Sequence, residues 1–151
     1  MSATLLTLSN HINGRAVAPA NDRWLEVFDP ATGAPYARCP ASDAADVEAA
    51  VAAARQAFPG WSTLPASQRA RWLERLASAL EERIDDFAQA ESRDGGKPIA
   101  LAREVEIPRA VSNLRFFAAA AMQFASESHQ GEAGLNITLR QPLGVVGCIS
   151  P

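Results

Sequence analysis

Cysteine and histidine are scarce in this sequence of 151 residues, which contains two of each. Cys39 and Cys148 are too few for a disulfide framework, and they do not form the closely spaced pair of a redox or zinc motif. His11 and His129 are distant in sequence from each other and from both cysteines. The sequence therefore excludes a domain held together by several disulfides and offers no Cys/His metal site, which fits a reducing compartment.

Long apolar runs and an excess of one charge are also missing. The longest unbroken apolar segment is Phe116 to Met122, far short of the roughly 20 residues that a membrane-spanning helix needs. The first residues lack the basic start of a signal peptide. The net charge is -3, and Lys and Arg are scattered among Asp and Glu, so no basic stripe favours nucleic acid. We therefore expect a cytoplasmic protein with neither a membrane nor a nucleic acid as its partner.

The composition is that of an ordinary globular domain, because 48% of the residues are apolar and 21% are charged. Residues 8–39 are typical of β-structure. Asn13-Gly14 suits a type I′ turn, which predicts a hairpin between residues 8–12 and 15–18.

A second hairpin is predicted between Trp24–Phe28 and Ala34–Cys39. The segment Asp29-Pro30-Ala31-Thr32-Gly33 has the proline and the exit glycine that a tight connection requires. We interpret Trp24 and Phe28 as packing residues.

The apolar spacing changes to a helical one at Ser42, which is expected to be an N-cap. Asp43 and Asp46 would lie near the positive end of the helix dipole. The apolar stripe consists of Val47, Ala50, Val51, Ala54, Ala57 and Phe58. This helix is predicted to end at Pro59-Gly60.

Two further helical regions follow. The first carries the apolar stripe Trp72, Leu73, Leu76, Leu80, Ile84 and Phe87, with a break near 83–86 and a stop at 94–98. The second begins at Pro98, and Pro108 either restarts or kinks it. Its buried side is predicted to contain Val111, Leu114, Phe117, Ala118, Ala121 and Met122.

The last part of the chain is predicted to contain a loop and two strands of different kinds. Residues 126–134 are polar and contain glycine, which indicates a loop. Leu135–Arg140 alternates like a strand with one exposed face, whereas 141–151 is an apolar run typical of a strand that is buried on both faces. A buried strand of this kind indicates an α/β protein with a covered parallel sheet, whose ligands bind at the carboxyl ends of its strands.

Several segments together resemble the NAD(P)-dependent aldehyde dehydrogenases in order and spacing. They are Ile12-Asn13-Gly14, Asp29-Pro30-Ala31-Thr32-Gly33, the pattern from Asp46 to Trp61, Asp94-Gly95-Gly96-Lys97-Pro98, and the run from Pro142 to Pro151. The segment from Ile107 to Ala118 is most similar to the 2-aminomuconic and 2-hydroxymuconic semialdehyde dehydrogenase branch.

The resemblance implies an α/β fold with N-terminal β-hairpins, an amphipathic helical bundle and the truncated first strand of a Rossmann-like nucleotide-binding domain. Residues 1–134 would be the hairpins and helices of the cofactor-binding domain. Residues 135–141 would form an oligomerisation strand, and 142–151 the incomplete first strand of the sheet. The resemblance also implies a homo-oligomer, a dimer or tetramer, when the protein is full length.

Family members oxidise an aldehyde through attack by a cysteine thiolate, hydride transfer to the nicotinamide, and hydrolysis of the thioester by water that a glutamate activates. In the family, these residues and the oxyanion-hole asparagine lie beyond the position of Pro151. The resemblance therefore implies an N-terminal fragment, and we predict that the 151-residue chain alone has no dehydrogenase activity.

The resemblance assigns cofactor-binding and substrate-binding residues in two places. Ile149, Ser150 and Pro151 match positions that line the cofactor site, which takes NAD, with NADP possible. Arg109 matches an arginine that contacts the substrate carboxylate, a role that suits a planar guanidinium. The alternatives are a plain strand end for the first group and a surface ion pair with Glu104 or Glu106 for Arg109.

A monovalent cation site is implied at Val27, Phe28 and Asp94, through two backbone carbonyls and a carboxylate. The alternative for Asp94 is a turn residue that accepts a hydrogen bond from its own backbone. Cys148 is interpreted as a core thiol and Cys39 as partly exposed and inert.

Two classes of function remain open. The first is oxidation of a carboxylate-bearing semialdehyde by an NAD-dependent enzyme. Within the enzymes, an acyl-CoA-forming relative or a succinic or betaine aldehyde enzyme is a separate possibility. The second is a non-catalytic α/β interaction module.

Overall fold

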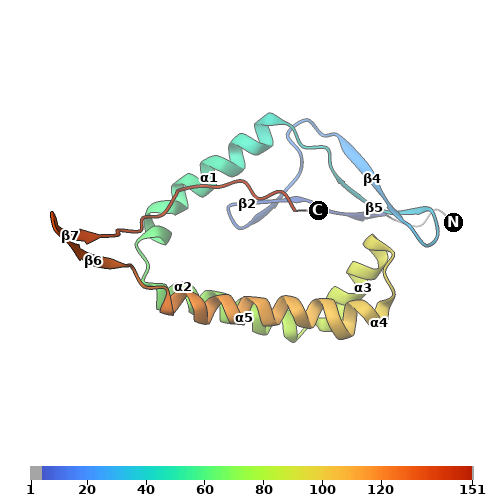
Figure 1. Cartoon of the computed structure of the whole chain (residues 1–151). Coiled ribbons are helices and arrows are strands. Elements are labelled where there is room, and N and C mark those ends of the chain that lie inside the picture. Colours follow the sequence, from blue (N-terminus) through green and yellow to red (C-terminus); the bar gives the residue numbers. More distant parts are fainter. Residues whose placement is uncertain (1–4, 151) are drawn as a thin grey trace.

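The computed structural model describes residues 5–150 and has a mixed α/β fold (Figure 1). Its strands are β1 (Leu6–Thr7), β2 (Asn10–Ile12), β3 (Arg15–Val17), β4 (Trp24–Asp29), β5 (Ala34–Pro40), β6 (Ser128–Gly131) and β7 (Gly134–Ile137). Its helices are α1 (Ala44–Ser62), α2 (Ala66–Glu81), α3 (Ile84–Gly95), α4 (Ile99–Leu101), the π-helical turn η1 (Ala102–Glu106) and α5 (Ile107–Gln123).

Both N-terminal hairpins are confirmed. β2 and β3 pair antiparallel around Asn13 and Gly14, whose φ angles of 52° and 73° are those of a type I′ turn. β4 and β5 pair antiparallel, and the backbone N–H of Gly33 donates to the carbonyl of Asp29 at 2.8 Å to close the connection. β1, which pairs parallel with β5, was not predicted, because two residues are too short to show a pattern.

The packing interpretation of the two aromatic residues in β4 holds only for Trp24. Trp24 is half-buried, and the guanidinium of Arg38 lies 4.7 Å from its ring centroid. Phe28 is 52% exposed, so its interpretation as a packed residue is wrong for this structure.

α1 begins with a capping box, one residue later than expected. The N-cap is Asp43 and not Ser42: the Asp43 carboxylate accepts from the backbone N–H of Ala45, and the Asp43 N–H donates to Asp46. Asp46 is only 6% exposed, and its carboxylate also accepts from the backbone N–H of Ala20, which ties the helix start to the segment after β3.

The predicted end of α1 at Pro59-Gly60 is also wrong, since the helix continues to Ser62 with Pro59 inside it. Pro59 lacks an N–H and so removes one helical hydrogen bond. The hydroxyls of Ser62 and Thr63 donate to the carbonyl of Pro59, which ends the helix one turn later.

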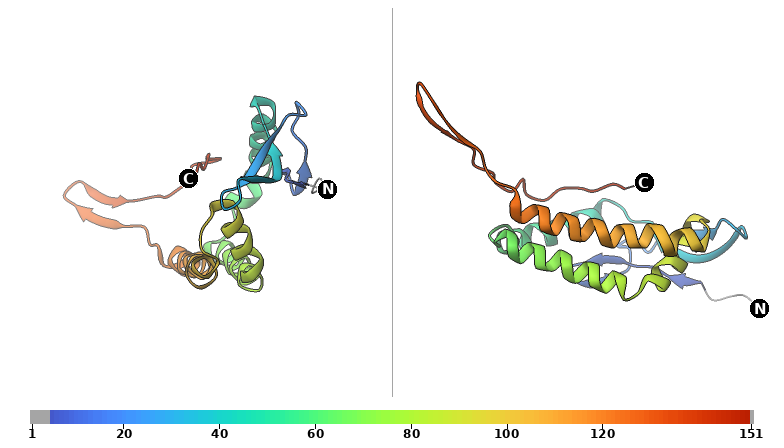
Figure 2. Two further views of the ribbon diagram at one scale, coloured as in Figure 1. Left: turned by 90° about the vertical axis from the view of Figure 1, so that its right-hand side faces the viewer. Right: turned by 60° about the horizontal axis from the view of Figure 1, so that its bottom comes forward.

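α2 and α5 lie side by side along their length and form the main helical contact (Figures 1 and 2). The residues buried in these two helices are small: Ala70, Ala77, Val111 and Ala118. Small side chains let the two backbones approach closely. Arg115 of α5 adds a bidentate ion pair with Glu81 of α2, at 3.0 and 2.5 Å.

The predicted break near residues 83–86 and the stop at 94–98 are confirmed. α2 ends at Glu81, α3 begins at Ile84, and α3 ends at a left-handed Gly96 with φ 70°. This conformation costs a side-chain-bearing residue strain, and a Cβ at Gly96 would lie 2.8 Å from Cγ of Pro30.

We expect Gly96→Ala to lower the free energy of unfolding by about 1–3 kcal/mol, from the left-handed strain and the contact with Pro30. Gly95→Ala is the matched control, because a Cβ there would meet only the flexible Lys97 side chain at 3.7 Å or more. Urea denaturation of both variants measures the difference. Equal stability of the two would contradict the structural role of Gly96.

A kink or a restart was expected at Pro108, and the structure shows that the helical region continues through a π turn placed just before this proline. α4, η1 and α5 follow one another without a gap, and Pro108 lies in the first turn of α5 directly after the wider π turn. A proline ring collides with the carbonyl four residues earlier in a regular helix. A π turn at this point changes that spacing and lets the helix continue.

The apolar stripes predicted for the helices are only partly buried. Val111 and Ala118 are buried as predicted, whereas Phe117 and Met122 are 60% and 56% exposed. Val47 on α1 is 58% exposed. The helical period is correct, but within residues 5–150 no layer covers these faces.

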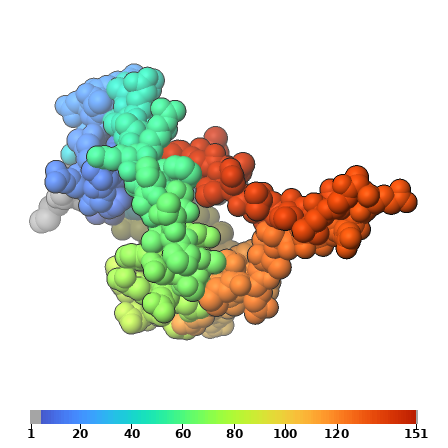
Figure 3. Space-filling view, turned by 90° about the vertical axis from the view of Figure 1, so that its left-hand side faces the viewer, coloured from blue at the N-terminus to red at the C-terminus, as the bar shows by residue number. Residues whose placement is uncertain are grey.

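The C-terminal region differs most from the prediction. Residues 126–134 are not simply a loop, because β6 pairs with β7 in a hairpin whose residues are all exposed and which projects from the body (Figure 3). β7 forms the first part of the alternating strand and ends at Ile137.

The buried strand predicted for 141–151 is not formed in the described part, 141–150. Leu143 and Ile149 are 95% and 99% exposed, and Cys148 is exposed and not in a core. The physical reason is that no strand among residues 5–150 pairs with this segment. Pro151 lies outside the described residues.

The surface of the structure is large for its mass. It amounts to 11672 Å², whereas a compact protein of 16.1 kDa exposes about 7,400 Å². The fold therefore leaves broad apolar faces on its helices uncovered. No helix within residues 5–150 has both the length and the apolar character needed to traverse a bilayer.

Candidate functional site

The substrate-site candidate Arg109 lies at a junction between two kinds of helix. η1 ends at Glu106 and α5 begins at Ile107, with Pro108 in its first turn. Arg109 follows directly and its side chain is exposed. The proline therefore fixes the start of the helix that carries the guanidinium.

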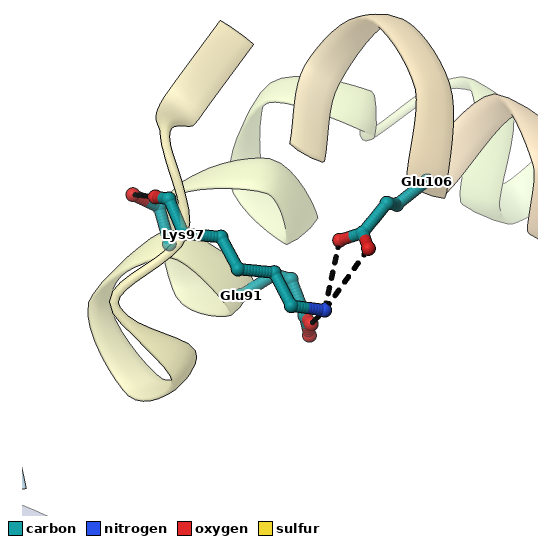
Figure 4. A network of polar contacts seen from close by, with 4 residues as sticks. Glu91, Lys97 and Glu106 are labelled. Carbon is teal, nitrogen blue, oxygen red and sulfur yellow. Dashed lines mark hydrogen bonds and ion pairs between the residues drawn. The ribbon is translucent and has the colours of Figure 1, made fainter. Parts of the chain in front are cut away.

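A three-residue charge cluster precedes this junction (Figure 4). Nζ of Lys97 donates to Oε1 of Glu91 at 2.7 Å and to both carboxylate oxygens of Glu106 at 3.0 Å. These hydrogen bonds, first that to Glu91 and then that to Glu106, raise the pKa of Lys97 above its ordinary value. The cluster links the last turn of α3 to the end of η1.

Arg109 differs from the other basic residues between 97 and 115. Lys97 binds Glu106, Arg103 lies 2.6 Å from Asp85, and Arg115 pairs with Glu81. The Arg115 hydrogen bond lowers the pKa of the Glu81 carboxyl. Within residues 5–150, Arg109 has no carboxylate within 4.0 Å, so its alternative as a surface ion pair with Glu104 or Glu106 is not formed here.

Arg115 has a structural role in these contacts. Its guanidinium joins α5 to α2 and also lies 3.8 Å from Glu74. Both oxygens of Glu81 are used in this pair. Arg115 therefore acts as a link between helices.

The cation-site candidate Asp94 was expected to bind either a cation or its own backbone, and its carboxylate binds a tyrosine side chain instead. Its Oδ1 accepts a hydrogen bond from the Tyr36 hydroxyl at 2.8 Å, and the guanidinium of Arg93 lies 4.4 Å from the Tyr36 ring. Desolvation and the bond to Asp94 raise the pKa of Tyr36. Asp94 thus ties α3 to β5. Its recorded side-chain hydrogen bond is this one to Tyr36, and not the bond to its own backbone that a turn residue would accept.

Val27 and Phe28 lie where the register between β4 and β5 shifts, and α3 packs against β4. A bulge of this kind leaves backbone groups outside the regular ladder. Among residues 5–150, no three His, Cys, Asp or Glu side chains gather in a way that could hold a metal. The cation role of Val27, Phe28 and Asp94 remains a prediction.

The cofactor-site candidates lie on the extended C-terminal segment. This segment runs beside α1 (Figure 1), and a groove of about 410 Å³ between them is lined by Val51, Arg55, Phe58 and residues 144–147. Ile149 and Ser150 lie beyond this groove, and the hydroxyl of Ser150 lies 3.7 Å from Sγ of Cys148. Since Ile149 is 99% exposed, the described residues do not by themselves enclose a dinucleotide.

Cys39 is half-buried on β5, as expected for a partly exposed thiol. For residues 5–150, the structure records no hydrogen bond from either cysteine to a histidine or carboxylate that would activate it. The chain thus presents no activated nucleophile in its described part.

Sequence reasoning missed the charge cluster around Lys97 and the bond between Tyr36 and Asp94. Lys97 follows Glu91 by six residues, a spacing that no helical rule brings together, and Tyr36 and Asp94 are 58 residues apart. The only signal was the helix stop at Gly96, which turns the chain so that Lys97 faces back along α3.

Comparison with known proteins gives one consistent answer. The sequence model of the aldehyde dehydrogenase family matches residues 17–151. The chain is 44% identical over 149 residues to 2-aminomuconic semialdehyde dehydrogenase of Homo sapiens, covering 97% of this chain and 30% of that protein. It is 39% identical over 150 residues to 2-hydroxymuconic semialdehyde dehydrogenase of Pseudomonas sp. (strain CF600), covering 95% and 31%.

Solved structures agree. PnpE in complex with nicotinamide adenine dinucleotide matches with a TM-score of 0.82 and 37% identity, over 86% of this chain and 27% of that one. Indole-3-acetaldehyde dehydrogenase in its apo form matches with a TM-score of 0.85 and 29% identity, over 94% and 33%. The chain spans about 30% of the length of the curated relatives it matches. It belongs to the aldehyde dehydrogenase family, a class of oxidoreductases.

Proposed function

We propose that this chain is the N-terminal part of a cytoplasmic, NAD(P)-dependent enzyme that oxidises a carboxylate-bearing semialdehyde to the acid. The observation that carries the proposal is the unpaired Arg109 in a chain that is 44% identical to a semialdehyde dehydrogenase. A semialdehyde of a dicarboxylic acid keeps one carboxylate, and a guanidinium can hold that group through two parallel hydrogen bonds.

In this proposal each candidate residue has one task. Arg109 holds the substrate carboxylate, which fixes the direction in which the aldehyde points. Ile149, Ser150 and Pro151 form one wall of the cofactor site, where bound NAD accepts the hydride. Val27, Phe28 and Asp94 would hold a monovalent cation, and residues 135–141 would join the chain to another copy of the enzyme.

We further propose that the 151-residue chain alone is inactive, because the catalytic cysteine, glutamate and asparagine implied by the family resemblance have no counterpart within it. The test is a chimera in which the chain replaces the matching segment of human 2-aminomuconic semialdehyde dehydrogenase. We expect NADH formation from the chimera. We expect none from the chain alone or from the relative without this segment.

Two results would contradict the proposal. Turnover by the isolated chain would show that the fragment interpretation is wrong. A chimera that is folded by circular dichroism but forms no NADH would favour the second candidate, a non-catalytic interaction module. The excess surface of the chain is the observation that favours that candidate.

A further inference from the structure

We propose that Lys97 is a positioning residue for Arg109: it holds the Glu106 carboxylate and so keeps the Arg109 guanidinium free for a substrate carboxylate. The inference rests on the proposed function, because it assigns to Arg109 the role described there. It explains why Arg109 remains available to a substrate carboxylate although Glu106 lies three residues before it.

The first step of the argument is the spacing of Glu106 and Arg109. The two residues are three positions apart where η1 continues into α5 without a break. Side chains at this spacing lie on the same side of a helix and, when oppositely charged, attract each other. Without another partner, Glu106 would therefore compete with any ligand for Arg109.

The second step is the occupation of Glu106. Nζ of Lys97 lies 3.0 Å from both carboxylate oxygens, and the side chains of Lys97 and Glu106 are only 39% and 32% exposed (Figure 4). Glu91 accepts another hydrogen bond from the same ammonium at 2.7 Å, which fixes its position. Lys97, which follows the end of α3, is thus held by Glu91 of that helix and occupies both carboxylate oxygens of Glu106, the competitor for Arg109.

The third step is the turn that aims Lys97. Gly96 takes the left-handed conformation that ends α3, and the Ser92 hydroxyl donates to the carbonyl of Lys97 at 2.7 Å. The backbone before and after the cluster is therefore held by its own contacts. Loss of the Lys97 charge should free Glu106 without moving the helices.

The test compares Lys97→Gln, Glu106→Gln and the double variant. In the 151-residue chain, we expect Lys97→Gln to shift the side-chain Nε resonance of Arg109 in ¹⁵N NMR, because Glu106 turns toward it. The added Glu106→Gln should abolish the shift. Lys97→Arg should leave the resonance near its original position, and Glu104→Gln is the control for loss of a nearby carboxylate.

In the chimera, Lys97→Gln should raise KM for a carboxylate-bearing aldehyde by a factor of about 1.4 to 2.3, which corresponds to the strength of a helical ion pair, at unchanged kcat. KM for a neutral aldehyde of similar size should not change, and the double variant should recover the original KM. An equal rise for both aldehydes, or no recovery in the double variant, would show that Lys97 is only structural.

The two proposals can fail separately. If Arg109→Gln leaves the preference for carboxylate-bearing aldehydes intact, the substrate role of Arg109 is wrong, whatever the NMR shows. If Arg109→Gln abolishes the preference but Lys97→Gln changes neither the resonance nor KM, only the positioning role is wrong.

Discussion

Replacing Arg109 by glutamine in the chimera is expected to lower kcat/KM for a carboxylate-bearing aldehyde about 10- to 100-fold. The exposed guanidinium has no carboxylate partner among residues 5–150, so its charge is available to the substrate. A hydrogen bond to a charged group contributes about 1.5–3 kcal/mol, which corresponds to a change of this size. Steady-state kinetics with the carboxylate-bearing aldehyde and a neutral one of similar length measure the effect.

Arg103→Gln is the matched control for this variant. Arg103 is also an exposed arginine of the same helical segment, but its guanidinium already pairs with Asp85 at 2.6 Å. We expect its loss to affect both aldehydes alike. A loss for the neutral aldehyde in Arg109→Gln as large as that for the charged one would exclude the carboxylate contact.

The second large effect is expected at the contact between α2 and α5. Ala77→Leu should lower the free energy of unfolding by about 2–3 kcal/mol, because Ala77 is fully buried and a larger side chain must push the helices apart. Ala79→Leu, exposed on the same helix, adds the same atoms without this contact and should change stability by less than about 0.5 kcal/mol. Urea denaturation compares the two.

A loss of similar size in both variants would mean that leucine disturbs α2 itself. No loss in either variant would mean that α2 and α5 are not closely packed. Only a selective loss at residue 77 supports the alanine contact as the centre of the helical layer.

Local rules predicted the elements whose determinants lie close together in sequence. Asn13-Gly14 specified its hairpin, and Gly96 specified the end of α3, because a positive φ angle depends on the residue itself. The end of α1 was missed, because α1 continues past Pro59 to Ser62 although Pro59 has no N–H to donate. The hydroxyls of Ser62 and Thr63 donate to the Pro59 carbonyl only at the actual end of the helix.

Features that depend on residues distant in the sequence could not be predicted from local patterns. The apolar run after residue 141 has the composition of a buried strand, yet a strand forms only when a neighbour supplies its hydrogen bonds, and residues 5–150 supply none. Likewise, Arg109 was identified through the family resemblance. That Glu106 does not pair with Arg109 depends on Lys97, and Lys97 reaches Glu106 only because the chain turns at Gly96.

The large exposed surface also affects how the chain responds to denaturant and heat. Since 11672 Å² already faces water, unfolding hydrates only about three quarters of the new area that a compact chain of this mass would expose. The denaturant slope and the heat-capacity increment both scale with that area. The transition of this chain should therefore be broader, and its stability curve flatter, than 151 residues would suggest.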